Sequence, residues 1–187
     1  MIYNLIAIIG PAGSGKDTLF NYLKENYKNK YHYIKNCTSR PQRDKNDTNY
    51  KFVSRKEFAE MVLQDAFIEV TVFNNWFYGT ELSELSKDKI NIGVFNPYSL
   101  LMLADNKQIN LQIIYISCSD KTRMLRQLMR ENNPNIKEII RRYSADEKDF
   151  KDLNKIYNLN FYINEDKKHL YNFVRFIDSL DQNEQYY

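Results

Sequence analysis

The stretch Gly10–Thr18 combines glycines and one lysine at the spacing of a phosphate-binding loop. The glycines let the backbone turn back on itself, so that several N–H groups point at one spot. Lys16 stands where an ammonium group reaches the outer phosphates of a nucleotide. The residues expected at these phosphates are Gly10, Ala12, Gly13, Ser14, Gly15, Lys16, Asp17 and Thr18.

The segments on either side of the loop are those that such a loop requires. The apolar run Leu5–Ile9 predicts a buried strand, and the apolar residues of Leu19–Leu23 recur at helical spacing. The start of the helix adds partial positive charge at the loop. Strand, glycine-rich loop and helix together favour a nucleotide site over a chance glycine-rich turn.

Asp17 stands where the loop pattern has a Ser or Thr whose hydroxyl binds Mg²⁺, and Thr18 follows it. A carboxylate is also a hard oxygen ligand, so Asp17 is a candidate Mg²⁺ ligand, direct or through water. Alternatively, Thr18 caps the helix and Asp17 only favours the positive end of the helix dipole. The residues themselves leave both interpretations open.

A polar loop expected over Asn36–Asn49 carries Arg40 and Arg43. Guanidinium groups are planar donors that match phosphate, so these two could bind a second phosphate group. An ordinary solvated basic loop is the alternative. Such long loops in compact domains are often functional.

A second group of arginines lies later in the chain. Arg123, Arg126 and Arg130 fall at offsets that place them on one face of a helix expected over 120–131. Arg141 and Arg142 lie in the next expected helix, beyond the break at Pro134. Phosphoryl transfer needs cations around the migrating group, and these side chains could supply them, although a solvated helix face is the alternative.

The sequence offers no general base for another kind of chemistry. His32 and His169 are isolated, and Cys37 and Cys118 lack metal-ligand spacing. A kinase acting on a phosphate acceptor needs no base, because its nucleophile is already an anionic oxygen. Positioning and charge neutralisation suffice for that reaction.

Composition predicts one globular domain. The chain has 187 residues, 43% hydrophobic and 27% charged. Its net charge of +3 argues against wholesale nucleic-acid binding and leaves local basic patches as an alternative. Its two cysteines are expected to be reduced, and no apolar run is long enough for a membrane span. The first strand follows Met1 so closely that we expect no signal peptide, and hence a cytoplasmic protein.

The elements that must position these side chains alternate between strand and helix, which predicts an α/β fold with a parallel sheet wrapped by helices. Expected strands lie at 31–35, 67–73, 76–78, 90–95, 111–116 and 161–163. Expected helices lie at 17–27, 54–64, 81–87, 98–105, 120–131, 136–150 and 167–180. The interval 36–80 breaks the alternation and is typical of a small β-rich insertion.

Several short motifs, in order, resemble the guanylate kinase family from about residue 3 to residue 180. The loop Gly10–Lys16 is similar to that family's P-loop, and Thr38–Arg43 with Tyr50–Ser54 resembles its acceptor-binding segment. Phe67–Glu69 and Tyr78–Thr80 match two further blocks. Arg126 and Arg130 resemble the lid arginines, and Arg141 or Arg142 the later one.

This resemblance implies a P-loop NTPase-type fold with core 1–35, 81–119 and 151–180, an acceptor-binding insertion 36–80 and a helical lid 120–150. It implies ATP and Mg²⁺ as cofactors and nucleotides as small-molecule partners, in a monomer or homodimer without nucleic acid or membrane. Arg40, Arg43, Tyr50 and Tyr78 would hold the acceptor phosphate, and Glu69 and Thr80 would read the guanine edge. The catalytic cations would be Lys16, Arg126, Arg130, Arg141 and Arg142.

Three positions depart from the family pattern. Asn36 replaces a serine near the base, whereas Val94 and Asn96 replace acidic residues after the third core strand. Asn96 removes a carboxylate expected near Mg²⁺, which Asp17 would restore from the P-loop side. We keep Asn36 and Asn96 among the acceptor-binding candidates.

We therefore expect ATP-dependent phosphoryl transfer to a nucleoside monophosphate, foremost GMP or dGMP. The Gly-Lys-Asp sequence and Asn96 also resemble ribose 1,5-bisphosphate phosphokinase, and a relaxed deoxynucleoside monophosphate kinase is a further alternative. A non-catalytic binding module of the family is the alternative from another class. Such modules typically lose the P-loop lysine, which this chain keeps.

Overall fold

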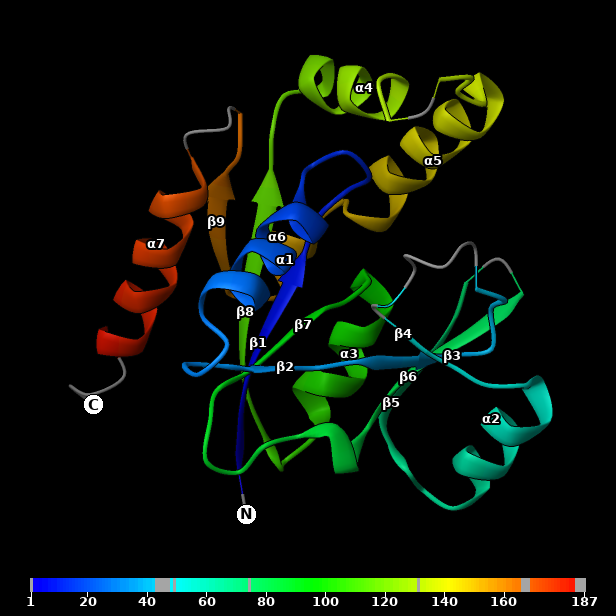
Figure 1. Ribbon diagram of the computed structural model, residues 1–187, viewed down its shortest axis with the longest axis vertical. Coiled ribbons are helices and arrows are strands. Elements are labelled where there is room, and N and C mark those ends of the chain that lie inside the picture. Colours follow the sequence, from blue (N-terminus) through cyan, green and yellow to red (C-terminus); the bar gives the residue numbers. More distant parts are fainter. Residues whose placement is uncertain are drawn as a thin grey trace. The chain divides into compact units, whose positions relative to one another are not determined.

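The computed structural model describes residues 2–42, 48, 50–73, 75–130, 132–165 and 169–183 (Figure 1). The chain divides into two compact units. One comprises Met1–Ala7 with Asn29–Gln112, and the other comprises Ile8–Lys28 with Ile113–Tyr187. Strands β1 (Tyr3–Ile9) and β8 (Ile109–Ser117) each run across the division between them.

The described strands form two sheets, in the orders β2-β7-β1-β8-β9 and β4-β3-β6-β5. In the first sheet β2 pairs with β7 in parallel, and β8 pairs with β9 in parallel. The predicted α/β class with a parallel sheet is therefore confirmed. Leu5–Ile9 of β1 is buried throughout, as expected for an apolar strand covered on both faces.

The first unit contains the whole four-stranded sheet. Besides its parts of β1 and β8, this unit contains β2 (His32–Tyr33), β3 (Asn36–Thr38), β4 (Tyr50–Phe52), α2 (Arg55–Leu63), β5 (Phe67–Phe73), β6 (Trp76–Glu81), η1 (Leu82–Glu84), β7 (Asn91–Val94) and α3 (Pro97–Asp105). Ser54 begins α2, a helix expected from the sequence, with a capping box in which its hydroxyl accepts from Glu57 N–H. Helix α3 packs on β5.

The second unit carries the glycine-rich loop between β1 and α1. Its elements are α1 (Lys16–Asn26), α4 (Asp120–Leu128), α5 (Ile136–Asp149), α6 (Leu153–Ile156), β9 (Leu159–Ile163) and α7 (His169–Asn183). Helix α1 packs against α7, and α4 packs against α5 (Figure 1). Phe173, Val174 and Ile177 are buried, so they form the apolar face of α7.

The expectation of an uninterrupted loop over Asn36–Asn49 is wrong at its beginning. Residues Asn36–Thr38 form β3, which pairs with β6 in antiparallel fashion and with β4 in parallel fashion. Local polarity favoured a loop, but the two neighbouring strands complete the backbone hydrogen bonds of β3, and Cys37 and Thr38 become fully buried.

Other segments also differ from the prediction. Helix α4 ends at Leu128, so Arg130 lies beyond the helix and does not share its face with Arg123 and Arg126. The helix expected at 81–87 is a single short turn, η1, and α6 was not predicted. These are short segments whose few residues give too little periodicity to read. No helix among the described residues is long and apolar enough to cross a membrane.

Candidate nucleotide-binding and acceptor sites

The P-loop adopts the backbone conformation that its glycines allow. Gly13 has φ +81° and Gly15 has φ +91°, values that side chains rarely permit. A Cβ on Gly13 would lie 2.6 Å from the carbonyl oxygen of Arg123, and one on Gly15 would lie 2.3 Å from Nδ2 of Asn164. Glycine is therefore required at both positions by conformation and by space.

Three N–H groups of this loop, those of Gly13, Gly15 and Lys16, are available for an anion. Ser14 N–H donates to the carbonyl of Pro11 at 3.1 Å, but no described residue accepts from the N–H of Gly13, Gly15 or Lys16. Ser14 Oγ is buried and has no hydrogen-bond partner among the described residues. Unpaired donors at the beginning of a helix form an anion site, which is the chemistry that nucleotide phosphates need.

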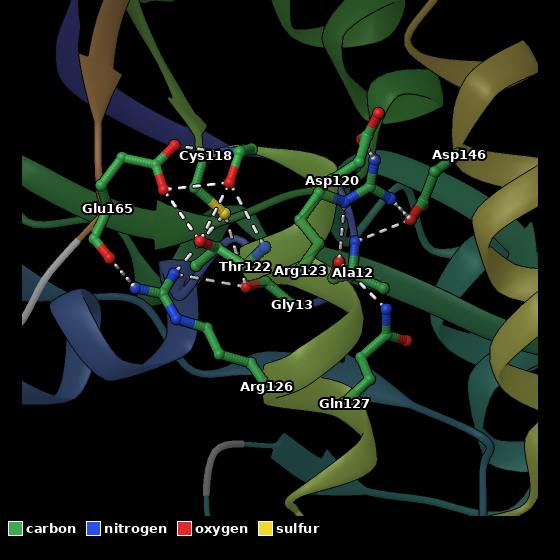
Figure 2. A network of polar contacts seen from close by, with 11 residues as sticks. Ala12, Gly13, Cys118, Asp120, Thr122, Arg123, Arg126, Gln127, Asp146 and Glu165 are labelled. Atoms are coloured by element: carbon green, nitrogen blue, oxygen red, sulfur yellow. Dashed lines mark hydrogen bonds and ion pairs between the residues drawn. The ribbon is translucent and has the colours of Figure 1, made fainter.

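The carbonyl groups of the same loop are held by donors from other elements, as Figure 2 shows in part. Arg126 donates to the carbonyls of Gly13 at 3.4 Å and Ser14 at 3.2 Å. Asn164, which follows β9, donates to the Ser14 carbonyl at 2.8 Å. Because donors from other elements bind these carbonyls, the peptide groups are held in place. Their N–H groups point away from those donors.

Arg123 and Asp146 hold both ends of Ala12 (Figure 2). Asp146 Oδ2 accepts from Ala12 N–H at 2.8 Å and from Arg123 Nη2 at 2.7 Å. Arg123 Nε donates to the Ala12 carbonyl at 3.1 Å, and its guanidinium lies 4.7 Å from the Tyr143 ring centroid. Burial raises the pKa of Asp146 even though Ala12 N–H and Arg123 lower it. We name this arrangement of Ala12, Arg123 and Asp146 the P-loop clamp.

The predicted catalytic cations fall into two groups. Lys16 is the first residue of α1, is half-buried and makes no ion pair with any described residue, whereas Arg126 contacts the P-loop. Arg130 is exposed, and both Arg141 and Arg142 bind Glu138, at 2.7 and 2.8 Å. These two arginines lower the pKa of Glu138 to about 2. Arg130, Arg141 and Arg142 are therefore not brought to the P-loop in this structure.

Asp17 is exposed in the first turn of α1, and Thr18 beside it is exposed as well. Gly15 is the N-cap and no side chain caps α1, so the interpretation of Thr18 as a cap is wrong. The described residues contain no cluster of three acidic, histidine or cysteine ligands. Mg²⁺ does not need one, because it is usually held by one or two carboxylates together with nucleotide phosphates and water. Asp17 fits that role.

Aromatic rings surround the arginine predicted to bind the acceptor phosphate. Arg40 is 8% exposed, and its guanidinium lies 5.4 Å from the ring centroid of Tyr50 and 5.3 Å from that of Phe52. Tyr50 and Tyr78 meet edge to face with centroids 5.9 Å apart. The structure thus brings together three of the four predicted phosphate-binding residues. Arg43 lies outside the described residues.

Glu69, on β5, is 2% exposed and lies in a cluster of hydroxyl and amide groups. Thr80 Oγ1 lies 2.8 Å from Glu69 Oε1 and 3.0 Å from Asn36 Oδ1, and Ser99 Oγ donates to Glu69 Oε2 at 2.8 Å. Burial raises the pKa of Glu69, whereas the hydrogen bonds from Thr80 and Ser99 lower it. Glu69 is thus no solvent-facing strand residue.

Asn96 has a structural position. It is the N-cap of α3, where its Oδ1 accepts from Ser99 N–H at 3.0 Å, and its Nδ2 donates to Thr71 Oγ1 at 2.8 Å. Asn36 Nδ2 donates to the Val94 carbonyl at 3.0 Å. Both asparagines thus belong to the same polar cluster as Glu69, through Ser99 and Thr80 respectively.

Sequence reasoning missed four residues of these sites. It placed Arg123 among the arginines that could supply charge for phosphoryl transfer and not against the P-loop backbone, and it did not single out Asp146, Asn164 or Ser99. An isolated acid, amide or hydroxyl carries no local pattern. The one usable signal was Asn96-Pro97-Tyr98-Ser99, in which Asn and Pro mark the start of a helix with Ser99 in its first turn.

Comparison with known proteins gives a consistent result. The guanylate kinase family model matches residues 3–175. The guanylate kinase of Mycoplasma genitalium is 31% identical over 135 residues, which span 69% of this chain and 56% of that protein. The guanylate kinase of Campylobacter jejuni strain RM1221 is 25% identical over 179 residues, which span 92% of this chain and 86% of that protein.

A crystal structure of guanylate kinase from Anaplasma phagocytophilum has the same fold. It matches with a TM-score of 0.66 and 19% sequence identity, covering 100% of this chain and 88% of that chain. The family match covers nearly the whole chain and includes both the P-loop and the cluster around Glu69. The chain belongs to the guanylate kinase family.

Proposed function

We propose that this protein transfers a phosphoryl group from ATP to GMP or dGMP and so forms the diphosphate. The observation that carries the choice of acceptor is the buried Glu69 carboxylate beside the Thr80 hydroxyl. Guanine presents N1–H and the N2 amine as adjacent donors, and one ionised carboxylate accepts from both. Adenine presents an acceptor at N1, which would leave the carboxylate repelled and partly unpaired.

The positions of the chain's own residues support the following roles. The N–H groups of the P-loop and the Lys16 ammonium bind and orient the phosphates of ATP. Arg126 stabilises the loop and adds positive charge beside it. Arg40, Tyr50 and Tyr78 orient the acceptor phosphate. Mg²⁺, held by Asp17 directly or through water together with the ATP phosphates, would neutralise charge on them.

The acceptor is tested by measuring ATP-dependent phosphorylation of GMP, dGMP, AMP and ribose 1,5-bisphosphate, with wild type and Glu69→Ala. We expect the wild type to prefer GMP or dGMP over AMP, and the variant to lose this preference while ATP binding survives. Glu60→Ala, an exposed acid on α2, is the matched control. A wild type that phosphorylates the sugar bisphosphate and ignores GMP would overturn the acceptor but not the fold.

We also propose a reducing, cytoplasmic location. Cys37 and Cys118 are free, and burial raises the pKa of Cys37 to about 11 and raises that of Cys118 as well. Both are therefore thiols rather than reactive thiolates at neutral pH. This supports the expectation of reduced cysteines.

A further inference from the structure

Ser99 makes a contact with Glu69 that a merely structural serine does not need. The residue is 2% exposed and lies in the first turn of α3, where its N–H is already satisfied by the Asn96 cap. Its hydroxyl donates to Glu69 Oε2 at 2.8 Å, on the opposite carboxylate oxygen from Thr80. The side chain therefore acts on the carboxylate rather than on its own helix.

We propose that Ser99 is a positioning and specificity-determining residue, whose hydroxyl keeps the Glu69 carboxylate ionised and oriented for guanine. The proposal rests on the proposed function and deepens it. It also gives Asn96 a purpose, because the Asn96 cap fixes the turn of α3 that carries Ser99. Asn96 thus acts on the acceptor site through Ser99 rather than through a metal.

The geometry leaves room for the base in hydrogen-bonding terms. A carboxylate has about four lone-pair positions, two on each oxygen. The hydroxyls of Thr80 and Ser99 take one on each oxygen, and the Thr80 backbone N–H takes a third, so that one position remains for an N–H of guanine. A protonated Glu69 would instead present an O–H group toward another donor. Guanine recognition therefore requires the ionised form.

Burial and hydrogen bonds act in opposite directions on the ionisation of Glu69. Burial raises its pKa, and Thr80 and Ser99 are the side chains that oppose burial. The titratable residues on the elements packed around it are Tyr78 and Glu81 on β6, Cys37 on β3, and Tyr98 and Asp105 on α3. The charges of these residues are not among the causes of the pKa shift of Glu69. Glu81 forms an ion pair with Lys51 at 2.6 Å.

Removing the Ser99 hydroxyl must therefore move the Glu69 pKa further upward. A carboxyl with a raised pKa is ionised only at higher pH, so binding that needs the carboxylate improves as pH rises through that pKa. Loss of the hydroxyl displaces this rise to higher pH. A loss of packing alone would change stability and affinity without displacing it.

The test compares wild type, Ser99→Ala and Ser99→Thr, with Ser86→Ala as a control hydroxyl in the same unit. KM for GMP, KM for ATP and kcat are measured from pH 5 to pH 9. In the same variants without nucleotide, the Glu69 carboxyl is titrated by carbon-13 NMR and assigned with Glu69→Gln. Thermal unfolding checks that each variant is folded.

We expect Ser99→Ala to raise KM for GMP about tenfold near neutral pH, with KM for ATP and kcat little changed. In Ser99→Ala, the pH range over which GMP binding improves and the titration of Glu69 both move to higher pH. Ser99→Thr restores both to the wild-type pH. Ser86→Ala matches wild type. An unchanged titration and an unchanged pH range in folded Ser99→Ala would overturn the role of Ser99 alone. A wild type inactive on GMP at every pH would overturn the proposed function and this inference together, even if the titration moved.

Discussion

Lys16 begins α1, so this residue lies at the positive end of the helix dipole. No described residue pairs with the Lys16 ammonium, which leaves it available for phosphate. The Ser14 hydroxyl, two residues earlier in the loop, is buried and has no hydrogen-bond partner among the described residues. A buried polar atom without a partner marks a position where a ligand supplies the missing interaction.

We predict that Lys16→Ala leaves the fold intact and lowers kcat at least about a hundredfold, because it removes a cation preorganised for transition-state charge. The measurement is steady-state transfer to GMP at saturating ATP. Lys24→Ala, on the same helix, is the matched control and is expected to behave as wild type. Equal turnover by Lys16→Ala and wild type would exclude the P-loop role.

Asp17→Ser is predicted to weaken catalysis even though it restores the usual loop pattern. Asn96 is uncharged and caps α3. Asp17→Ser would therefore leave no acidic side chain at position 17 or at position 96. The Mg²⁺ concentration for half-maximal rate should rise roughly tenfold. The rate is measured against Mg²⁺ concentration, with Asp17→Glu as the variant that keeps the charge. An unchanged Mg²⁺ requirement would contradict the role of Asp17 and indicate that phosphates and water alone hold the metal.

At the scale of elements, the P-loop clamp joins α4 and α5 to the glycine-rich loop. The side chains of Arg123 and Asp146 are 8% and 17% exposed, so this is a buried ion pair. Such a pair contributes little net stability over an apolar pair of the same size, but breaking it leaves one buried charge. The ion pair serves to fix the orientation of the two peptide groups of Ala12.

We predict that Asp146→Ala destabilises the protein by about 3 kcal/mol, because it leaves Arg123 and Ala12 N–H without their acceptor. The double variant Arg123→Met with Asp146→Leu should recover much of that loss. Urea unfolding of the two variants and wild type measures both effects. If the double variant were less stable than Asp146→Ala, the stability of this region would not depend on an uncompensated charge.

At the scale of the whole molecule, transfer between two nucleotides requires that water be excluded from the phosphates. The predicted lid, 120–150, contains α4 and α5. Arg141 and Arg142 are held there by Glu138, at a partly exposed site where ion pairs are weak. Anionic ligands can therefore compete for them.

We predict that amide hydrogen exchange in α4 and α5 slows when ATP and GMP are bound together, and less with either alone. The physical reason is that arginines gathered in one segment are stabilised by phosphate charge. Exchange followed by mass spectrometry tests this, with α2 as an internal control. Equal exchange in α4 and α5 with and without both substrates would exclude a closing lid.

Much of this arrangement could be predicted from sequence, for reasons of locality. The P-loop is recognised because its glycines, its lysine and its flanking elements are adjacent in the chain, and backbone conformation is a local property. The helix that follows Ser54 and the strands β5 and β6 were predicted for the same reason. The family resemblance added the order of the acceptor motifs, including Glu69 and Thr80.

The tertiary structure decided which distant side chains share a cluster. Asp146 lies 134 residues from Ala12 and Asn164 lies 150 residues from Ser14, and no local pattern signals either contact. Ser99 reaches Glu69 because α3 packs on β5, and Asn36 belongs to a strand because β6 pairs with its neighbours. Hydrogen bonds and burial at such distances depend on packing, which is set by the whole chain. Sequence thus identified the groups that do the chemistry, and packing determined which groups hold them in place.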